Sequence, residues 1–207
     1  YAEIGSRAFV SCKSLIKADL GNNITKIGAY TFGYCTDLQE IKIPQSLETI
    51  GDGTFINCES LNKIDLPESF KFVSNKCFLG CKSLETINLP KELEKIGKLA
   101  FAECIKLVEA ELPENLKEIK ELAFRNCEKL SIIKIPLNVK KIGSEAFIGC
   151  TNVKELIYYA EKCNTPKSNK PIFDYSYGET NLSIGNLVQE LDDNLFRGMN
   201  LTQIEIP

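Results

Sequence analysis

The stretch "AFRNCEKLSIIKIP", residues 123–136, is one copy of a phrase that returns along the chain and decides its fold. A phenylalanine recurs at one constant interval, that from Phe9 to Phe32, and a cysteine stands three positions after it. The phenylalanines are Phe9, Phe32, Phe55, Phe78, Phe101, Phe124 and Phe147. The cysteines are Cys12, Cys35, Cys58, Cys81, Cys104, Cys127 and Cys150. Recurrence at one fixed spacing indicates a repeat protein, in which each unit packs against its neighbours.

Each unit begins with an aliphatic residue that is usually followed by glycine. The units begin at residues 4, 27, 50, 73, 96, 119, 142, 168 and 191. Beyond Cys150 the phase is kept if Phe173 and Phe196 take the phenylalanine position, which leaves three extra residues in unit 142–167. These lie in "YYAEKCNTPKSNKP", residues 158–171, a composition typical of a surface loop. We therefore predict a single solenoid domain over residues 1–207, with an incomplete last unit.

Two hydrophobic patterns occur within one unit. In "EAFIGCTNV", residues 145–153, the apolar residues have the spacing of one face of a short helical turn. In "LQEIKIP", residues 38–44, the alternation is that of a half-buried strand, which the proline ends. These patterns predict an α/β repeat solenoid, a right-handed superhelix of the leucine-rich-repeat kind. One parallel β-sheet of about nine strands, on the order of 40 Å long, would form one face, with short helical turns on the other.

The seven repeated cysteines are predicted to form an inward-facing ladder, because free cysteine behaves as a small hydrophobe. Disulfides between neighbouring units would need side chains turned along the stack, and seven cysteines cannot all pair. A metal or redox role for Cys77 and Cys81 is a minor alternative, because metal sites favour CxxC pairs or histidine. Cys163, in the long loop, is expected to be the exposed and reactive thiol.

Composition argues against most catalytic and binding classes. The 207 residues include no histidine, which removes Ser–His and Cys–His pairs and the HExxH metal site. No Lys/Arg-rich block indicates nucleic-acid binding, and no apolar stretch reaches the roughly 20 residues of a membrane span. An enzyme would need paired acids such as Glu109 and Glu111, or a reactive Cys163. We expect no enzyme activity, cofactor or metal, and neither nucleic-acid binding nor membrane insertion.

The segment "IKIPQSLETIGDGTFINCESLNKI", residues 41–64, resembles the BspA-type leucine-rich repeat family, and the resemblance covers almost the whole chain. Departures are local: Val73-Ser74 replaces Ile-Gly, Lys120 stands in a glycine position, and Ser176 and Met199 stand in cysteine positions. The resemblance implies surface or secreted proteins, often of mucosa-dwelling anaerobic bacteria and some protists, that act as adhesins toward host matrix proteins or other microbes. It brings no catalytic residue with it.

We therefore expect a protein-binding module, extracellular or on a cell surface, that recognises extracellular matrix or bacterial surface proteins. The alternative is an intracellular interaction scaffold or a spacer domain. The opening "YAEIGSRAF" has no signal-peptide character, so targeting and anchoring segments are expected to be absent from this chain. A monomer is expected, although exposed stack ends would also allow an end-to-end dimer.

The partner would bind the outward positions of the strands. Charges in the first three units alternate, and the predicted pairing runs Lys17–Glu40–Lys63 and Asp19–Lys42–Asp65 across adjacent strands. Units six to eight carry apolar and aromatic residues instead, which favours them as the contact surface. The predicted contact residues are Ile132, Lys134, Glu155, Ile157, Tyr159, Tyr175 and Tyr177.

Overall fold

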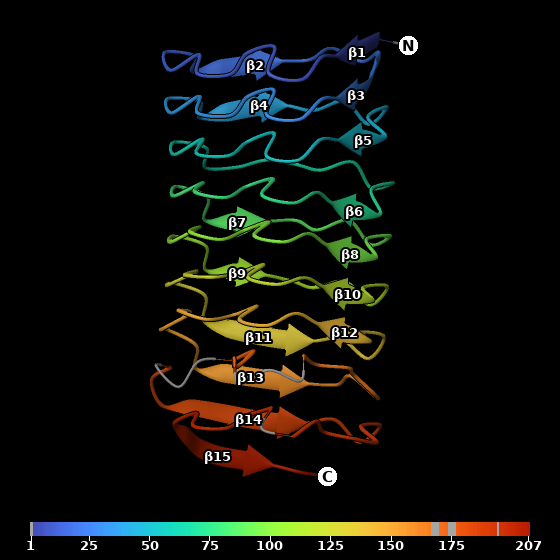
Figure 1. Cartoon of the computed structure of the whole chain (residues 1–207), viewed down its shortest axis with the longest axis vertical. Coiled ribbons are helices and arrows are strands. Elements are labelled where there is room, and N and C mark those ends of the chain that lie inside the picture. The colour runs from blue at the N-terminus through green and yellow to red at the C-terminus, as the bar shows by residue number, and fades with distance from the viewer. Residues whose placement is uncertain (1, 167–169, 174–176, 194) are drawn as a thin grey trace.

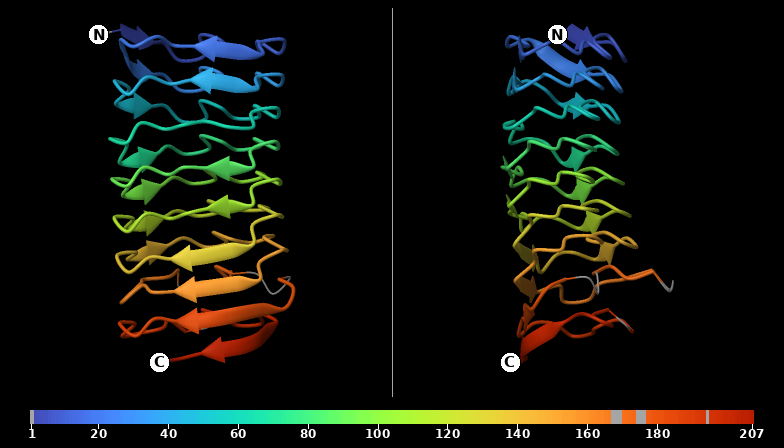
Figure 2. Two further views of the ribbon diagram at one scale, coloured as in Figure 1. Left: turned by 180° about the vertical axis from the view of Figure 1, so that it is seen from behind. Right: turned by 90° about the vertical axis from the view of Figure 1, so that its left-hand side faces the viewer.

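Each repeat unit forms one coil, and the coils stack so that equivalent residues lie above one another (Figure 1). The computed structural model describes residues 2–166, 170–173, 177–193 and 195–207. The two chain ends lie at opposite ends of the stack, as the views from behind and from the side also show (Figure 2). We number the coils one to nine in chain order.

The strands of one side, which we call the main ladder, are all parallel. They are β2 (Lys17–Asp19), β4 (Glu40–Lys42), β7 (Thr86–Ile87), β9 (Glu109–Ala110), β11 (Ile132–Ile135), β13 (Glu155–Tyr158), β14 (Thr180–Ile184) and β15 (Leu201–Glu205). Coil three joins through isolated bridges, from Glu40 to Lys63 and from Asp65 to Asn88. The solvent side of this ladder is the main face.

A second ladder of parallel strands runs along the opposite edge of coils one to seven (Figure 1). Its strands are β1 (Ala2–Ile4), β3 (Ile24–Ile27), β5 (Thr49–Ile50), β6 (Phe72–Val73), β8 (Lys95–Ile96), β10 (Glu118–Ile119) and β12 (Lys141–Ile142). These strands contain the aliphatic residue at which each unit begins. The sequence pattern did not predict this ladder.

The predicted α/β architecture is wrong, because the described part of the chain contains no helix. The fold is a β-solenoid of parallel strands. In the segments where helical turns were predicted, every second backbone N–H donates its hydrogen bond to the next coil. Leu99, Phe101 and Glu103 donate to carbonyls of coil six, at 2.8–3.2 Å. Ala100, Ala102 and Cys104 donate three residues back within the coil. A helix would keep all these bonds internal.

Left-handed residues explain why this segment cannot be helical. Leu99 and Glu103 have φ of 57° and 61°, and each of coils one to seven has an equivalent pair four residues apart, as in Leu122 and Asn126. L-residues adopt this conformation singly rather than in helices. The apolar spacing of "EAFIGC" therefore fits a run of tight turns as well as a helix, and periodicity alone could not distinguish them.

The core of the stack is a column of phenylalanine rings. Neighbouring rings lie 5.1–5.8 Å apart between centroids with interplanar angles of 2–21°, from Phe9 through Phe147 to Phe173 and Phe196. Offset stacking of this kind adds to the burial of the rings themselves. Phe173 and Phe196 thus continue the column across the irregular unit.

The irregular unit carries its extra residues in one place. Lys141 forms a bridge to Asn164, and these two residues are separated by the regular interval of the repeat. The Glu145 N–H donates to the carbonyl of Pro171, and this separation is three residues longer than the regular interval. β13 then pairs with β14 through Glu155 and Asn181, with the same excess of three positions. The additional residues therefore lie between Asn164 and Pro171, at the second-ladder edge, and do not disturb the main ladder.

The repeated cysteines make a second column beside the rings. From Cys35 to Cys150 they are buried, and each thiol lies 3.1–3.3 Å from the carbonyl of the phenylalanine in the preceding coil, as in Cys104 Sγ to Phe78 O. The same carbonyl also accepts the N–H of the cysteine in its own coil, as between Cys81 and Phe78. The thiol thus adds a hydrogen bond between coils to its role as a small apolar group.

A column of glycines allows the coils to approach at the second ladder. A Cβ at Gly51 would lie 2.3 Å from the backbone nitrogen of Ala29. Ser74 occupies this position in coil four, where β5 and β6 are not paired, and its hydroxyl donates to the Gly51 carbonyl at 2.8 Å. Lys120 occupies it in coil six, and its ammonium lies 5.4 Å from the centre of the Phe72 ring.

Candidate functional site

On the first two coils of the main face, the charged side chains are paired with one another. Lys17 Nζ lies 2.9 Å from Glu40 and Lys42 Nζ lies 3.3 Å from Asp19, both across adjacent strands. The Gly21 amide and the Lys42 ammonium together lower the pKa of Asp19. Exposed pairs of this kind contribute little to stability. This part of the face therefore presents little unbalanced charge.

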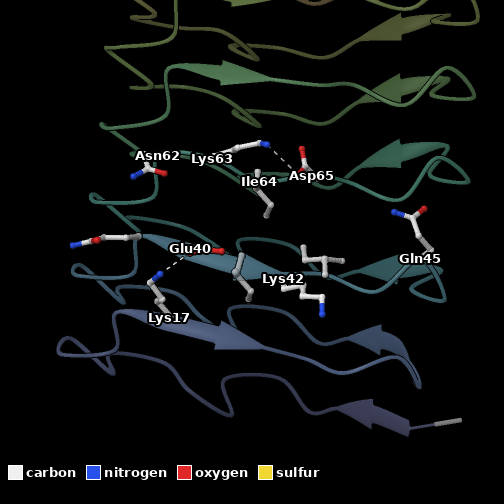
Figure 3. A pocket seen from close by; sticks show the side chains of 11 residues that line it. Lys17, Glu40, Lys42, Gln45, Asn62, Lys63, Ile64 and Asp65 are labelled. Atoms are coloured by element: carbon white, nitrogen blue, oxygen red, sulfur yellow. Dashed lines mark ion pairs between the residues drawn. The ribbon is translucent and has the colours of Figure 1, made fainter.

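The predicted chains of alternating charge do not extend to coil three. Lys63 pairs with Asp65 of its own coil at 3.5 Å, and neither of them forms a salt bridge with coil two (Figure 3). The cause is local separation of the coils, because coil three is held to β4 only by the bridge at Glu40 and Lys63. The predicted pairing is thus right for coils one and two and wrong beyond them.

A pocket of about 580 Å³ opens where these two coils separate (Figure 3). It is lined by Lys17, Gln39, Glu40, Ile41, Lys42, Ile43, Gln45, Asn62, Lys63, Ile64 and Asp65. Its charged groups are already paired, and its lining includes no cysteine, hydroxyl or aromatic side chain. The pocket offers amide and paired-charge hydrogen bonding, but no nucleophile with an adjacent base.

Farther along the main face, β11 and β13 bring together most of the predicted contact residues. Ile132 pairs with Glu155 and Lys134 with Ile157 in the register of the two strands. Ile132 is 45% exposed, whereas Glu155 and Ile157 are half-buried. Tyr159 follows β13 directly and is exposed. These five residues form one continuous surface.

Lys134 is the centre of the polar contacts on this surface. Its ammonium lies 5.6 Å from the centre of the Tyr159 ring and 3.9 Å from Glu114. Tyr159 also lines a groove of about 160 Å³ with Glu114, Leu137, Asn186 and Leu187. Leu187 is 57% exposed, and the sequence patterns did not single it out. Its signal was only its apolar character in a loop position.

The other two predicted tyrosines do not add to the surface. Tyr177 is buried, and its hydroxyl donates to the Phe147 carbonyl at 2.8 Å. It thereby replaces the cysteine thiol that bonds the equivalent carbonyl in other coils, so its predicted role in partner contact is wrong. Tyr175 lies outside the described residues.

The cysteines offer little thiol reactivity. All nine lie within the described residues, and none forms a disulfide. Cys163 is buried, contrary to the prediction that it is exposed, and burial raises its pKa to about 11. Burial likewise raises the pKa of Cys77 to about 12. Both thiols therefore stay protonated at neutral pH. The exposed cysteine is Cys12, in the first coil.

Acidic and thiol side chains do not gather into a metal site within the described ranges. These residues contain no cluster of three or more Cys, Asp or Glu side chains that could hold a metal ion. In the same part of the chain there is also no helix long and apolar enough to cross a membrane.

Similarities to solved structures concern the whole solenoid. A leucine-rich repeat protein of Bacteroides ovatus is 24% identical, with a TM-score of 0.66, and a leucine-rich cell surface protein of Faecalibacterium prausnitzii is 22% identical, with a TM-score of 0.72. Each match covers 99% of this chain and 64% of the other. A leucine-rich repeat protein of T. pallidum is 32% identical over 75% of this chain and 62% of the other, with a TM-score of 0.51.

The chain thus spans a little under two thirds of the length of these proteins. No curated protein matches it in sequence. The family model for the BspA type leucine rich repeat region matches residues 2–131 and 72–202, which together cover nearly all of the solenoid described above. The chain belongs to the BspA-type leucine-rich repeat family.

Proposed function

We propose that the chain is a non-enzymatic protein-binding module that acts outside the cell or on its surface. The observation that carries this proposal is the surface formed by Ile132, Lys134, Glu155, Ile157 and Tyr159 on β11 and β13. It joins aliphatic and aromatic side chains to a few polar groups, the composition that protein interfaces favour.

The location of this surface supports the same proposal. Solenoid proteins bind partners along their extended faces, and the main ladder has its longest strands from β11 onward. In coils one and two, ion pairs across the strands already satisfy the charged side chains. A partner would therefore gain more by covering the later coils, where Ile132 lies beside the exposed Tyr159 and the half-buried Ile157.

Placement outside the cell rests on similarity. The similar protein of Faecalibacterium prausnitzii is a cell surface protein, and adhesion toward host matrix or bacterial surface proteins is the activity we propose for this chain.

One observation favours an intracellular scaffold or spacer instead. None of the nine cysteines is paired, and free thiols are usual in reducing compartments. Protease treatment of intact expressing cells separates the two functions, because a surface protein is cleaved and an intracellular one is protected.

Binding to immobilised matrix proteins and to bacterial cells tests the proposed function. The informative variant is Ile132→Asn, Ile157→Asn, which removes apolar contact without changing charge. Its matched control is Ile16→Asn, Thr49→Asn, in which both side chains are exposed and lie away from β11 and β13. Circular dichroism would confirm that both variants fold.

We expect the unchanged chain to bind, and the affinity of Ile132→Asn, Ile157→Asn to be lower by about tenfold or more. Removing an anchor residue of an interface costs more than about 1 kcal/mol of binding free energy. The control should bind as the unchanged chain does. Equal binding by all three proteins would place the contact elsewhere, and no binding to any of these surfaces would favour the spacer.

A further inference from the structure

Charge balance on the main face changes between its early and middle coils. In each of coils one to three, the two outward strand positions hold one cation and one anion, as in Lys17 and Asp19 or Lys63 and Asp65. In coil five, both positions hold glutamate, Glu109 and Glu111. Like charges on neighbouring outward positions repel one another, so this part of the face lacks an internal counter-charge.

The middle carboxylates lack ionic partners. Glu85, Glu109 and Glu111 are exposed, and no salt bridge among the described residues involves any of them. Lys134, which holds the outward position of coil six equivalent to Glu111, is within 4 Å of Glu114 instead and also lies over the Tyr159 ring. Lys154 projects toward Gly178 in coil eight. The negative charge of coils four and five is therefore available to a partner.

Exposed lysines near this region lie to one side of it. Lys106 and Lys129 are on the turns that lead into β9 and β11, not on the strands themselves. They would border a partner laid across the strands without neutralising the carboxylates beneath it.

Aliphatic side chains lie between these carboxylates. Val108 is 48% exposed and immediately precedes Glu109. Ile132 is 45% exposed and pairs in register with Glu155, while the Ser131 N–H donates to the Val108 carbonyl at 3.2 Å and joins the two coils. β11, which begins at Ile132, lies between β9 and β13 on successive levels of the main ladder (Figure 1), and those two strands begin at Glu109 and Glu155.

We propose that the main face binds a protein segment that carries basic and aliphatic residues in alternation. The surface that it covers is the acidic–aliphatic strip, which consists of Glu85, Val108, Glu109, Glu111, Ile132 and Glu155. Lysine or arginine side chains supply the counter-charge that the strip lacks, and aliphatic side chains cover Val108 and Ile132. This inference rests on the proposed function and adds the chemistry of the partner.

The probe is the synthetic peptide (Lys-Val)₄, titrated into the ¹⁵N-labelled chain at low salt and followed by amide chemical shifts. We expect shifts centred on residues 85–88, 108–111 and 131–134. The peptide (Lys-Ser)₄ should bind several-fold more weakly than (Lys-Val)₄. The peptide (Glu-Val)₄ should not bind. Raising the NaCl concentration to about 0.3 M should weaken (Lys-Val)₄ binding, because exposed ion pairs are screened.

Two variants with the same change in net charge separate the strip from the overall charge. Glu85→Gln, Glu109→Gln, Glu111→Gln should weaken (Lys-Val)₄ binding about tenfold, as expected when three exposed ion pairs are lost. Glu68→Gln, Glu92→Gln, Glu128→Gln changes exposed glutamates outside the strip and should leave binding within about twofold.

Equal weakening by both triple variants would mean that only net charge attracts the peptide, and would overturn the proposal. Absence of (Lys-Val)₄ binding, or shifts centred elsewhere, would overturn it as well. The proposed function does not depend on these peptide results. It would stand if the unchanged chain bound matrix proteins or cells and the Ile132→Asn, Ile157→Asn variant did not. If that binding were also absent, both proposals would fail together.

Discussion

The phenylalanine and cysteine columns differ from the main face in how they use the repeat. In the core, each of coils one to seven presents the same ring and the same thiol, at nearly constant spacing. On the main face, equivalent positions change from Lys17 and Glu40 to Glu109 and Ile132. Stacking requires identical neighbours, whereas binding one partner requires a surface that differs from place to place. The fold therefore depends on the repeated residues, and specificity on the varied ones.

The largest expected difference between the two regions is their response to alkaline pH. Burial raises the pKa of core thiols, to about 12 in Cys77 and well above the ordinary value in Cys81 and Cys127. In the unfolded chain the pKa of a thiol is about 8.5. Above that pH the unfolded state loses protons that the folded state retains, so the free energy of unfolding falls by about 1.4 kcal/mol per pH unit for each such thiol. Summed over the fully buried thiols of Cys77, Cys81, Cys104 and Cys127, this is a large part of the stability of an ordinary domain.

Urea denaturation at pH 8, 9 and 10 measures this loss. The matched variant is Cys81→Ala, Cys104→Ala, Cys127→Ala, which should be less stable at pH 8 but should lose stability with a shallower slope. The same slope in both proteins would contradict the role of the buried thiols.

Phe101→Ala should have the next largest effect. Its ring is fully buried and lies 5.3 Å and 5.2 Å from the rings of Phe78 and Phe124. Removing a buried phenylalanine costs about 3–5 kcal/mol through lost burial and the cavity left behind. Phe9→Ala, at the 42% exposed end of the column, should cost less than half as much in urea denaturation. Equal losses would mean that the column is not the core of the stack.

Gly51→Ala should cost about 1–3 kcal/mol, a typical overpacking penalty. The new Cβ would meet the backbone of coil two, and the coils would have to separate, as they do at Ser74, where β5 and β6 are not paired. Gly5→Ala is the control, because no atom lies within 4 Å of its added Cβ, and it should change stability by less than about 0.5 kcal/mol. Thermal unfolding of both variants would show whether close approach of coils matters.

Glu40→Gln should have the smallest effect on stability. The Lys17–Glu40 pair is exposed, so its loss should cost about 0.2–1 kcal/mol and less at high salt. A double-mutant cycle with Lys17→Met measures the coupling. A coupling energy well above that range would show that the early main face contributes to folding as the core does.

The repeat period, its phase and the strands of the main ladder follow from the sequence because the side chains that define them recur. The second ladder was missed because its strands are mostly two residues long, too short for an alternation to be seen. Helical turns were predicted because left-handed residues such as Leu99 and Glu103 carry no signal in their residue type. The hydrogen bonds that replace a helix run between coils, and a local pattern contains no information about them.

The candidate site could be predicted in part. Ile132 and Lys134 are exposed, as their outward positions in the repeat indicated, and Tyr159, which was assigned to the adjacent loop, is exposed with them. Tyr177 was misplaced because its unit is irregular: its hydroxyl fills the thiol position one residue after Ser176 in the chain. The position of Lys134 near Glu114 was also not predicted, because Glu114 lies outside the outward strand positions that the repeat defines. Which side chains pair in this way depends on the three-dimensional arrangement of the coils, which the sequence pattern does not specify.

The most direct test of binding through the later coils is methyl NMR of the chain labelled at isoleucine δ1 carbons, with and without a matrix or bacterial protein to which it binds. Ile132 and Ile157 report on the later main face, and Ile16, 52% exposed in coil one, reports on the early one. We expect the methyl signals of Ile132 and Ile157 to shift or broaden on binding while the signal of Ile16 stays in place. A change at Ile16 with none at Ile132 and Ile157 would contradict the assignment of binding to the later coils.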